Sequence, residues 1–263
     1  MTESRPVLIV TRHEASDDGV VRAAEEEGCE VTRLALFETR PGTQAAAFTE
    51  WLGGPAAGTA LAWTSRRAAA LLAEAALPAH RDVLERLPLF AVGEESAGPI
   101  TASGLPVSVP RTGLGASHLA AHLIEQAPAL GIRRVAFLHG DRALSDLPDS
   151  LARAGIPVDR FEVYRTAYLP ADPSPLTRAL HARRSCVIAY YSPSAIAGLE
   201  RLLDPGDGES LHADGVALAR GDTTYQALLR WGYAHAHRPV GDRFGSFDAF
   251  VLDAVQSAAR SPQ

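Results

Sequence analysis

The sequence predicts an α/β protein of two similar lobes, each with a parallel sheet flanked by helices. Two observations predict this class. Short apolar, β-rich runs alternate along the 263-residue chain with amphipathic segments of helical length, which is typical of parallel strands joined by crossover helices. The second half of the chain also repeats the first at an offset of about 127 residues, which indicates a duplicated α/β unit.

Four short matches define the repeat, and they keep nearly the same spacing. Residues 7–12 match 135–140, 28–33 match 155–160, 63–65 match 190–192, and 92–96 match 220–224. Two similar lobes create a cleft between them, and clefts are where ligands bind. We therefore expect the functional site to lie between the lobes.

The individual elements follow from the same alternation. Residues 7–10 form a continuous apolar run, typical of a strand buried on both faces of a parallel sheet. Residues 17–27 follow as an amphipathic helix, which Gly28 closes. We expect further strands at 31–37, 60–63, 89–92, 107–109, 135–138, 158–164, 187–191, 216–219 and 234–237. We expect further helices at 67–74, 117–126, 144–154, 194–203, 224–231 and 247–257.

Two extended segments rich in turn formers, 37–42 and 164–175, are the expected crossings between the lobes. If both segments cross, the first lobe is discontinuous and consists of residues 1–37 with 172–263, while 41–165 form the second lobe. A cut at the midpoint, into 1–130 and 131–263, is the alternative. No Pro/Gly/Ser-rich linker lies near residue 130, so we favour the discontinuous lobe.

Composition excludes several classes of protein. A hydrophobic content of 46% with 21% charged residues is typical of a soluble globular chain. No apolar run reaches the length of a membrane span, and the N-terminus lacks a signal pattern, so we expect no membrane partner. The only cysteines, Cys29 and Cys186, form no CxxC, which favours the reducing cytoplasm. A net charge of −6 argues against a nucleic-acid partner.

Small polar residues cluster directly after the predicted strands of both halves. Ligands of open parallel sheets bind outside the carboxyl ends of the strands, where helix N-termini favour anions. The alternative is that these residues only cap helices, and a duplication would copy caps as well. The candidates for ligand binding are Thr11, Arg12, Ser65, Ser96, Ser192 and Thr224.

Arginines near the predicted strand ends or crossings suit a ligand with several carboxylates, because guanidinium groups pair with carboxylates in a bidentate way. A solvated surface position is the alternative for each of them. These arginines are Arg12, Arg66, Arg67, Arg142, Arg165 and Arg220.

Other motifs point to no cofactor. Residues 113–118 begin like a dinucleotide fingerprint, but His118 replaces the third glycine, so a loop leading into a helix is the better interpretation. The pairs His118/His122 and His235/His237 lack a third ligand at a sensible spacing, so we expect no metal. The sequence contains neither a nucleophile elbow nor a Cys/His pairing, so no motif indicates covalent catalysis.

Tyr164 breaks the internal repeat, because its counterpart in the first half is Phe37. A phenol at the expected crossing can donate a proton or a hydrogen bond where a phenyl ring cannot. An ordinary strand tyrosine is the alternative interpretation.

Taken in order, these motifs resemble the uroporphyrinogen-III synthase family, and the resemblance covers nearly the whole chain. It rests on 10–12, 63–65, 91–93 with 96–97, Gly155 before 163–164, 191–194 and 221–224. The chain departs from the family pattern at Arg66-Arg67, where Pro-Asn is common, at Ser96, where Thr is common, and at Arg220-Gly221-Asp222. These departures leave open a non-catalytic module of the same fold that binds a tetrapyrrole or another anion.

The resemblance implies two α/β domains joined by a two-stranded linker, with the active site in the cleft. It implies that hydroxymethylbilane is cyclised with loss of water and inversion of ring D, without metal or cofactor. Tyr164 would assist departure of the hydroxyl, and the polar candidates at the strand ends would hold the substrate carboxylates. We expect a cytoplasmic monomer that receives substrate transiently from hydroxymethylbilane synthase. A solute-binding or phosphate-sugar protein is the other alternative, which the lack of a signal peptide and of a phosphate loop disfavours.

Overall fold

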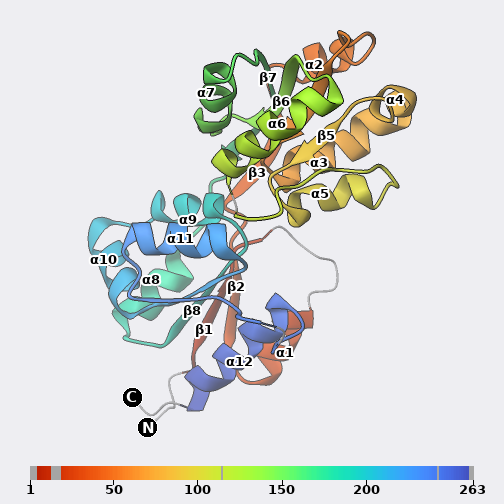
Figure 1. The fold of residues 1–263 in the computed structure, drawn as a ribbon. Helices are drawn as coiled ribbons and strands as arrows, with labels where there is room; N and C mark the ends of the chain where they lie inside the picture. The colour runs from red at the N-terminus through yellow and green to blue at the C-terminus, as the bar shows by residue number, and fades with distance from the viewer. Residues whose placement is uncertain (1–4, 13–18, 114, 242, 261–263) are drawn as a thin grey trace. The chain divides into compact units, whose positions relative to one another are not determined.

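The chain divides into two compact units, of which the first is built from two separate stretches of the sequence. The structure is a computed structural model that describes residues 5–12, 19–113, 115–241 and 243–260. Unit 1 consists of Met1–Glu38 with Ala167–Gln263, and unit 2 consists of Thr39–Thr166. Each unit contains a five-stranded sheet covered by helices, so the predicted α/β class is confirmed (Figure 1).

Unit 1 is built on a wholly parallel sheet. Its strand order is β10-β9-β8-β1-β2, with β1 beside both β8 and β2. The strands are β1 Val7–Val10, β2 Glu30–Arg33, β8 Cys186–Tyr190, β9 Val216–Ala219 and β10 His235–His237.

Successive side chains of a strand point to opposite faces, and this alternation divides the helices of unit 1 into two layers. Val7 and Ile9 face a core shared with α8, α9, α10 and α11. Leu8 and Val10 face a second core, which α1 and α12 cover side by side (Figure 1). The helices are α1 Gly19–Glu26, α8 Ser174–His181, α9 Pro193–Glu200, α10 Pro205–Asp214, α11 Asp222–Trp231 and α12 Phe247–Arg260.

Unit 2 has the strand order β3-β7-β6-β4-β5. The last four strands of this order are parallel. β3 runs antiparallel to β7, because Leu169 N–H donates to the Leu36 carbonyl while Gly42 N–H donates to the Val163 carbonyl. The strands are β3 Phe37–Pro41, β4 Thr59–Trp63, β5 Leu89–Ala91, β6 Arg134–Gly140 and β7 Val158–Tyr168. β3 and β7 are also the strands along which the chain passes from one unit to the other.

The helices of unit 2 form two layers for the same reason. Leu61 and Trp63 of β4 face one core, and Ala60 and Ala62 face the other. The first layer holds α2 Ala45–Trp51, α3 Arg66–Leu71, a π-helical turn Leu72–Ala76, α4 Leu77–Leu84 and α5 Glu94–Thr101. The second layer holds α6 Ala116–Leu130 and α7 Asp146–Arg153. In the part of the chain that the structure describes, no helix is long and apolar enough to span a bilayer.

Two of the expected elements are wrong in detail. The single strand expected at 31–37 is broken, because β2 ends at Arg33 and β3 begins at Phe37. Leu34 and Leu36 lie between them and are buried in the core of unit 1, which bends the chain out of β2. The strand expected at 107–109 is reduced to one bridge, in which Ser108 pairs with Phe90 of β5.

Candidate functional site

The carboxyl end of β4 places Ser65 at the start of α3. Trp63, the last residue of β4, is fully buried, and Ser65 follows two residues later in an extended conformation. The Ser65 hydroxyl oxygen accepts a hydrogen bond of 3.1 Å from the Ala68 N–H. The capping interpretation of Ser65 is therefore correct, and it fixes the side chain at the edge of the sheet.

Tyr164 reaches the same serine from a different strand. Its hydroxyl donates a hydrogen bond of 3.1 Å to Ser65 Oγ. Tyr164 belongs to β7 and Ser65 follows β4, and β6 lies between these two strands in the sheet. The phenol must therefore cross the end of β6 to make this bond.

Gly140, the last residue of β6, is what allows the phenol to cross. A Cβ atom at this position would lie 2.4 Å from Tyr164 Cζ and 2.8 Å from its hydroxyl oxygen. The register between β6 and β7 shifts at His139, so that Gly140 stands opposite Tyr164. The ring thus packs directly on bare backbone, and no other residue type leaves room for it.

The two hydroxyl groups are arranged so that protons can be handed along them. Ser65 Oγ accepts bonds from Ala68 N–H and from Tyr164, which leaves the Ser65 hydroxyl hydrogen for another acceptor. Tyr164 uses its only hydrogen toward Ser65, which leaves its oxygen lone pairs for a ligand. A carboxylate or a leaving hydroxyl group finds both donor and acceptor here.

Ser96 lies near the end of β5, the strand next to β4, and its backbone carbonyl fixes its position. It lies in the first turn of α5 and is 7% exposed. The buried Trp63 indole N–H donates a hydrogen bond of 2.8 Å to the Ser96 carbonyl. This bond ties the start of α5 to the end of β4, the strand that carries Ser65. A hollow of about 780 Å³ opens beside it, lined in part by Gly93, Glu94 and Arg111.

In unit 1, Thr11 makes its hydrogen bonds within the sheet. Its hydroxyl donates to the Ala189 carbonyl at 2.7 Å, and its N–H donates to the same oxygen at 3.2 Å. Thr11 is only 2% exposed. Both of its hydrogens are used to join the ends of β1 and β8.

Arg12 lies in a cluster that sequence reasoning missed. Its guanidinium carbon is 4.7 Å from the centre of the Tyr191 ring, and its Nη1 is 3.5 Å from Asp248 Oδ1. The Tyr191 hydroxyl donates to the same carboxylate oxygen at 3.1 Å. The repeat offered one signal for this cluster, because Tyr191 matches Thr64 of the first half.

Ser192 is the counterpart of Ser65, but among the described residues no phenol donates a hydrogen bond to it. Its hydroxyl accepts a bond of 3.4 Å from Ala195 N–H and caps α9. The residue that corresponds to Tyr164 is Phe37, which has no hydroxyl group. The Tyr–Ser pair therefore forms in unit 2, and the equivalent position of unit 1 is a plain helix cap.

In unit 1, Thr224 is the third residue of α11, the helix that follows β9, and it is 5% exposed. The helix begins at Asp222, whose carboxylate pairs with Arg238 Nε at 2.8 Å. Arg220 directly follows β9, and its N–H donates to the Tyr190 carbonyl while its side chain is exposed. Thr224 thus lies in the first turn of a helix, where the N-terminal N–H groups favour anions.

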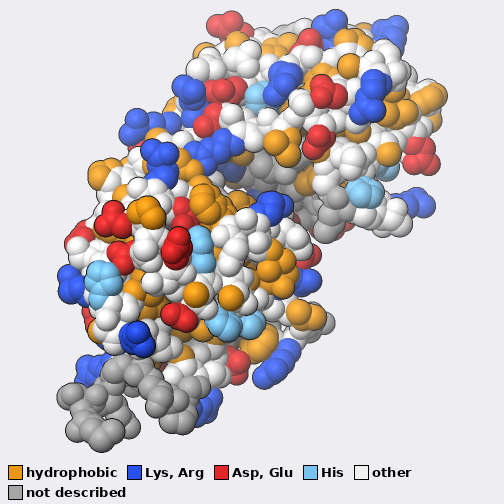
Figure 2. Space-filling model, turned by 90° about the vertical axis from the view of Figure 1, so that its left-hand side faces the viewer, with side chains coloured by type: hydrophobic (Ala, Val, Ile, Leu, Met, Phe, Trp, Pro, Cys, Tyr) orange, Lys and Arg blue, Asp and Glu red, His pale blue; other side chains and the backbone are white. Residues whose placement is uncertain are grey.

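The remaining arginines are exposed on the surface, and three of them face a carboxylate. The ion pairs are Arg66–Glu95 at 4.0 Å, Arg142–Asp141 at 3.9 Å and Arg165–Glu162 at 3.1 Å. Figure 2 shows a mixture of cationic and acidic side chains over the visible faces of both units. These exposed pairs are weak and exchange readily for another anion.

His139 is a buried polar group that sequence reasoning missed. It precedes Gly140 and is 8% exposed. Its Nδ1 lies 2.9 Å from the Gly140 carbonyl, and since a carbonyl only accepts, Nδ1 carries the hydrogen. Nε2 has no hydrogen-bond partner among the described residues. Burial, the largest influence, lowers the pKa of His139 below its usual value, so the ring is neutral.

The cysteines are not nucleophiles. Both are buried, and burial raises the pKa of the Cys186 thiol to about 11. Burial also raises the pKa of the Cys29 thiol, with the Glu27 carboxylate adding to the shift. Neither thiol forms the reactive thiolate near neutral pH.

The comparisons with known proteins agree with one another. The family described as "Uroporphyrinogen-III synthase HemD" matches residues 18–242. A solved structure of a mutant uroporphyrinogen III synthase from Thermus thermophilus is similar, with a TM-score of 0.67 at 20% identity, covering 96% of this chain and 98% of that one. The synthetase from Helicobacter pylori has a TM-score of 0.55 at 16% identity, covering 95% and 99%.

At such identities the similar structures show the fold, while the match over most of the sequence shows the family. No curated protein sequence matches the chain significantly. The family match includes Ser65, Tyr164 and Thr224, and it begins after the end of β1. The chain belongs to the uroporphyrinogen-III synthase family, whose members are cyclising lyases of tetrapyrrole biosynthesis.

Proposed function

We propose that this chain closes hydroxymethylbilane to uroporphyrinogen III, with ring D inverted, and that the Tyr164–Ser65 pair acts at the leaving hydroxyl. The observation that carries the proposed role is the hydrogen bond of 3.1 Å between the two side chains across Gly140. It holds a phenol at the carboxyl edge of a parallel sheet, where ligands of such sheets bind.

The first chemical step requires a proton. The substrate loses its terminal hydroxyl group as water and becomes an azafulvene, and a positioned acid lowers the barrier to that loss. Tyr164 turns its hydrogen from Ser65 to the leaving oxygen. Ser65 retains its own hydroxyl hydrogen, which it donates to the phenol oxygen as negative charge develops there.

The second requirement is one folded conformation of the substrate, since spontaneous closure gives the wrong isomer. The eight carboxylates of the substrate are the groups by which the protein can hold it in that conformation. We propose that Ser65 and Ser96 in unit 2, and Arg12, Ser192 and Thr224 in unit 1, bind some of these carboxylates. Thr11 contributes by fixing the strand end that carries Arg12, because its own hydrogens are used internally.

The proposal includes no metal ion and no cofactor, because the azafulvene forms readily once the hydroxyl group leaves. We further propose that the protein acts as a monomer in the cytoplasm and receives its unstable substrate directly from hydroxymethylbilane synthase. The composition of the chain and its lack of paired cysteines support this location.

The experiment is to incubate the purified protein with freshly made hydroxymethylbilane, and to separate isomers I and III after oxidation. Isomer III in excess over the no-protein control, without added metal or nucleotide, is the expected result. Isomer I alone, from protein whose folding is verified by circular dichroism, would refute catalysis and favour a module that only binds tetrapyrroles.

A further inference from the structure

The two units cover one face of their sheets differently, although the units are repeats. In unit 2, α6 lies closely on the edge strand β5. The ring of Phe90 in β5 is fully buried, and its centre is 5.7 Å from that of His122 in α6. Ser108, the bridge partner of Phe90, completes the contact with a hydrogen bond of 2.7 Å to His122. Two rings fill the space between helix and edge strand.

In unit 1, α12 takes the place of α6, because it follows the segment that pairs with β9, as α6 follows the segment of Ser108 that pairs with β5. Leu218 of β9 matches Phe90 in the repeat, and His237 pairs with Leu218 as Ser108 pairs with Phe90. α12 buries Val251 and Val255 in the core that also contains Leu218. Toward β10, however, the described residues show no ring contact between α12 and the edge strand, and Phe250 packs on Phe244 and Phe247 instead.

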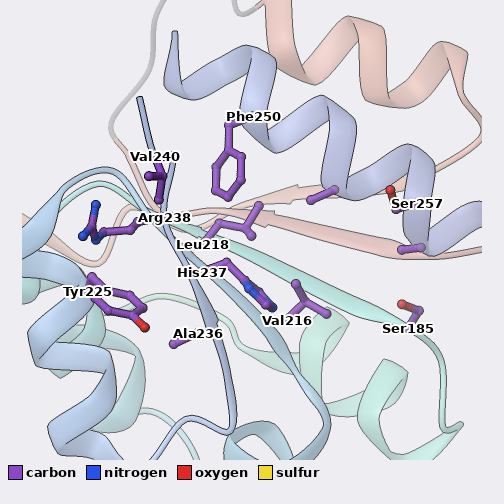
Figure 3. A pocket seen from close by; sticks show the side chains of 12 residues that line it. Ser185, Val216, Leu218, Tyr225, Ala236, His237, Arg238, Val240, Phe250 and Ser257 are labelled. Atoms are coloured by element: carbon purple, nitrogen blue, oxygen red, sulfur yellow. The ribbon is translucent and has the colours of Figure 1, made fainter. Parts of the chain in front are cut away.

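A hollow of about 600 Å³ takes the place of that contact. Figure 3 shows Leu218 and Val216 at its base, with Phe250 of α12 above them. Ala254 and Ala258, one and two turns beyond Phe250, continue the wall with small side chains. The hollow lies within unit 1, and its volume is in the range of small-molecule sites.

The chemistry of the lining selects an anion with an apolar body. Arg238 and His237 line the hollow beside Tyr225, and none of the described lining residues is an acid. Arg238 Nε is paired with Asp222 at 2.8 Å, and its guanidinium lies 5.5 Å from the centre of the Tyr225 ring. This anchoring holds the guanidinium in place and leaves its terminal NH₂ groups as donors.

We propose that this hollow is a second binding site, separate from the tetrapyrrole chemistry, for a small aromatic anion. The aromatic body lies on Leu218 and Val216 below Phe250, in the space that aromatic rings fill in unit 2. The anionic group binds Arg238, with His237 beside it. The site requires no contribution from the strand-end residues assigned to the substrate.

The test uses two fluorescent probes of similar aromatic size. One is 1-anilinonaphthalene-8-sulfonate, an anion, and the other is N-phenyl-1-naphthylamine, its neutral analogue. We expect saturable binding of the anionic probe to the full chain at one site per chain. Arg238→Gln should weaken the anionic probe about tenfold, as expected for a charged hydrogen bond, and leave the neutral probe within about twofold. Arg243→Gln, which removes an arginine outside the lining, is the control and should change neither probe.

Substitutions that fill the hollow provide a second, independent test of the proposed site. Leu218→Phe introduces the residue of unit 2 and should weaken both probes by about tenfold or more, without lowering the unfolding temperature markedly. Ala254→Leu fills the same space from the helix and serves if the first variant does not fold. Unsaturable binding, an unchanged affinity in a folded filled variant, or equal weakening of both probes by Arg238→Gln would overturn the proposal. So would self-association of the free chain in light scattering that the filled variants abolish, because a second copy would then occupy the hollow.

Discussion

Replacing Gly140 by alanine should move the Tyr164 phenol while changing the backbone little. The added Cβ would lie 2.4 Å from Cζ and 2.5 Å from Cε2 of the ring. Carbon atoms not bonded to each other come no closer than about 3.5 Å, so the ring must retreat by about 1 Å or more. A retreat of that size lengthens the 3.1 Å bond to Ser65 beyond hydrogen-bonding distance.

The expected cost in turnover follows from the role of the phenol. Loss of one positioned acid lowers kcat by roughly 10² or somewhat less, the lower end of the range for general acids. The reaction continues at a reduced rate and still gives isomer III, because hydroxymethylbilane loses water unaided. Overpacking should lower the free energy of unfolding by about 1–3 kcal/mol, since the ring is only half-buried and can yield.

A double-mutant cycle with Tyr164→Phe separates this effect from a general loss of structure. The phenylalanine variant keeps the ring that collides with the new methyl group but lacks the hydroxyl. If Gly140 acts by placing that hydroxyl, Gly140→Ala should reduce kcat in the Tyr164 background and cost little more in the phenylalanine background. KM should change less than kcat in both single variants.

The control variant is Gly54→Ala, since a Cβ at Gly54 meets no atom within 4 Å. It should leave both kcat and stability unchanged. Equal fold losses from Gly140→Ala in the two backgrounds would refute the placement of the phenol by Gly140. Full turnover in Tyr164→Phe would show that the tyrosine is a structural strand residue.

Three further predictions concern binding, pH and domain structure. Thr224→Ala should raise KM more than it lowers kcat in steady-state kinetics, because it removes one carboxylate contact among many; a loss confined to kcat would contradict this. His139 has a lowered pKa, so the unfolded chain gains a proton that the folded chain resists as pH falls below about 6.5, and stability falls there. Urea unfolding at pH 7.5 and 5.5 should therefore show a smaller acid loss in His139→Phe than in the wild type, and equal losses would exclude this cause. A chain of residues 41–165 should unfold cooperatively by itself in thermal denaturation, and one of 1–130 should not; the reverse would favour a boundary at the midpoint.

The strands were predicted well because burial on both faces leaves a continuous apolar run. β1, β9 and most of β4 and β8 are of this kind, and each is almost fully buried. Several helices were missed because their local sequence favours turns. α10 begins Pro205-Gly206-Asp207-Gly208, and α5 contains Gly98 and Pro99, yet both are helical. Packing against the sheet outweighs local preference in these segments.

The site was only partly predictable, because contacts across the sheet leave no trace in local sequence. The predicted strand ends suggested Ser65 and Thr224 as candidates, and the repeat suggested Tyr164. Nothing in the sequence showed that Tyr164 reaches Ser65, which requires the strand order β7-β6-β4 and a glycine at the end of β6. The buried His139 and the Asp248 partner of Arg12 were hidden for the same reason.

The repeat explains the scaffold, and our proposals for chemistry rest on its departures from symmetry. Where the two halves agree, as at Ser65 and Ser192, the residues cap helices in both units. Where the halves differ, new groups result: a phenol at Tyr164 against Phe37, and an open hollow at Leu218 against Phe90. A duplicated fold supplies its structural contacts twice, so one copy of a position can change while the other keeps its original packing. A double variant that exchanges Phe37 and Tyr164 should therefore fold normally but lose the Tyr–Ser pair. A fall in its kcat would show that turnover depends on this asymmetry between the two halves.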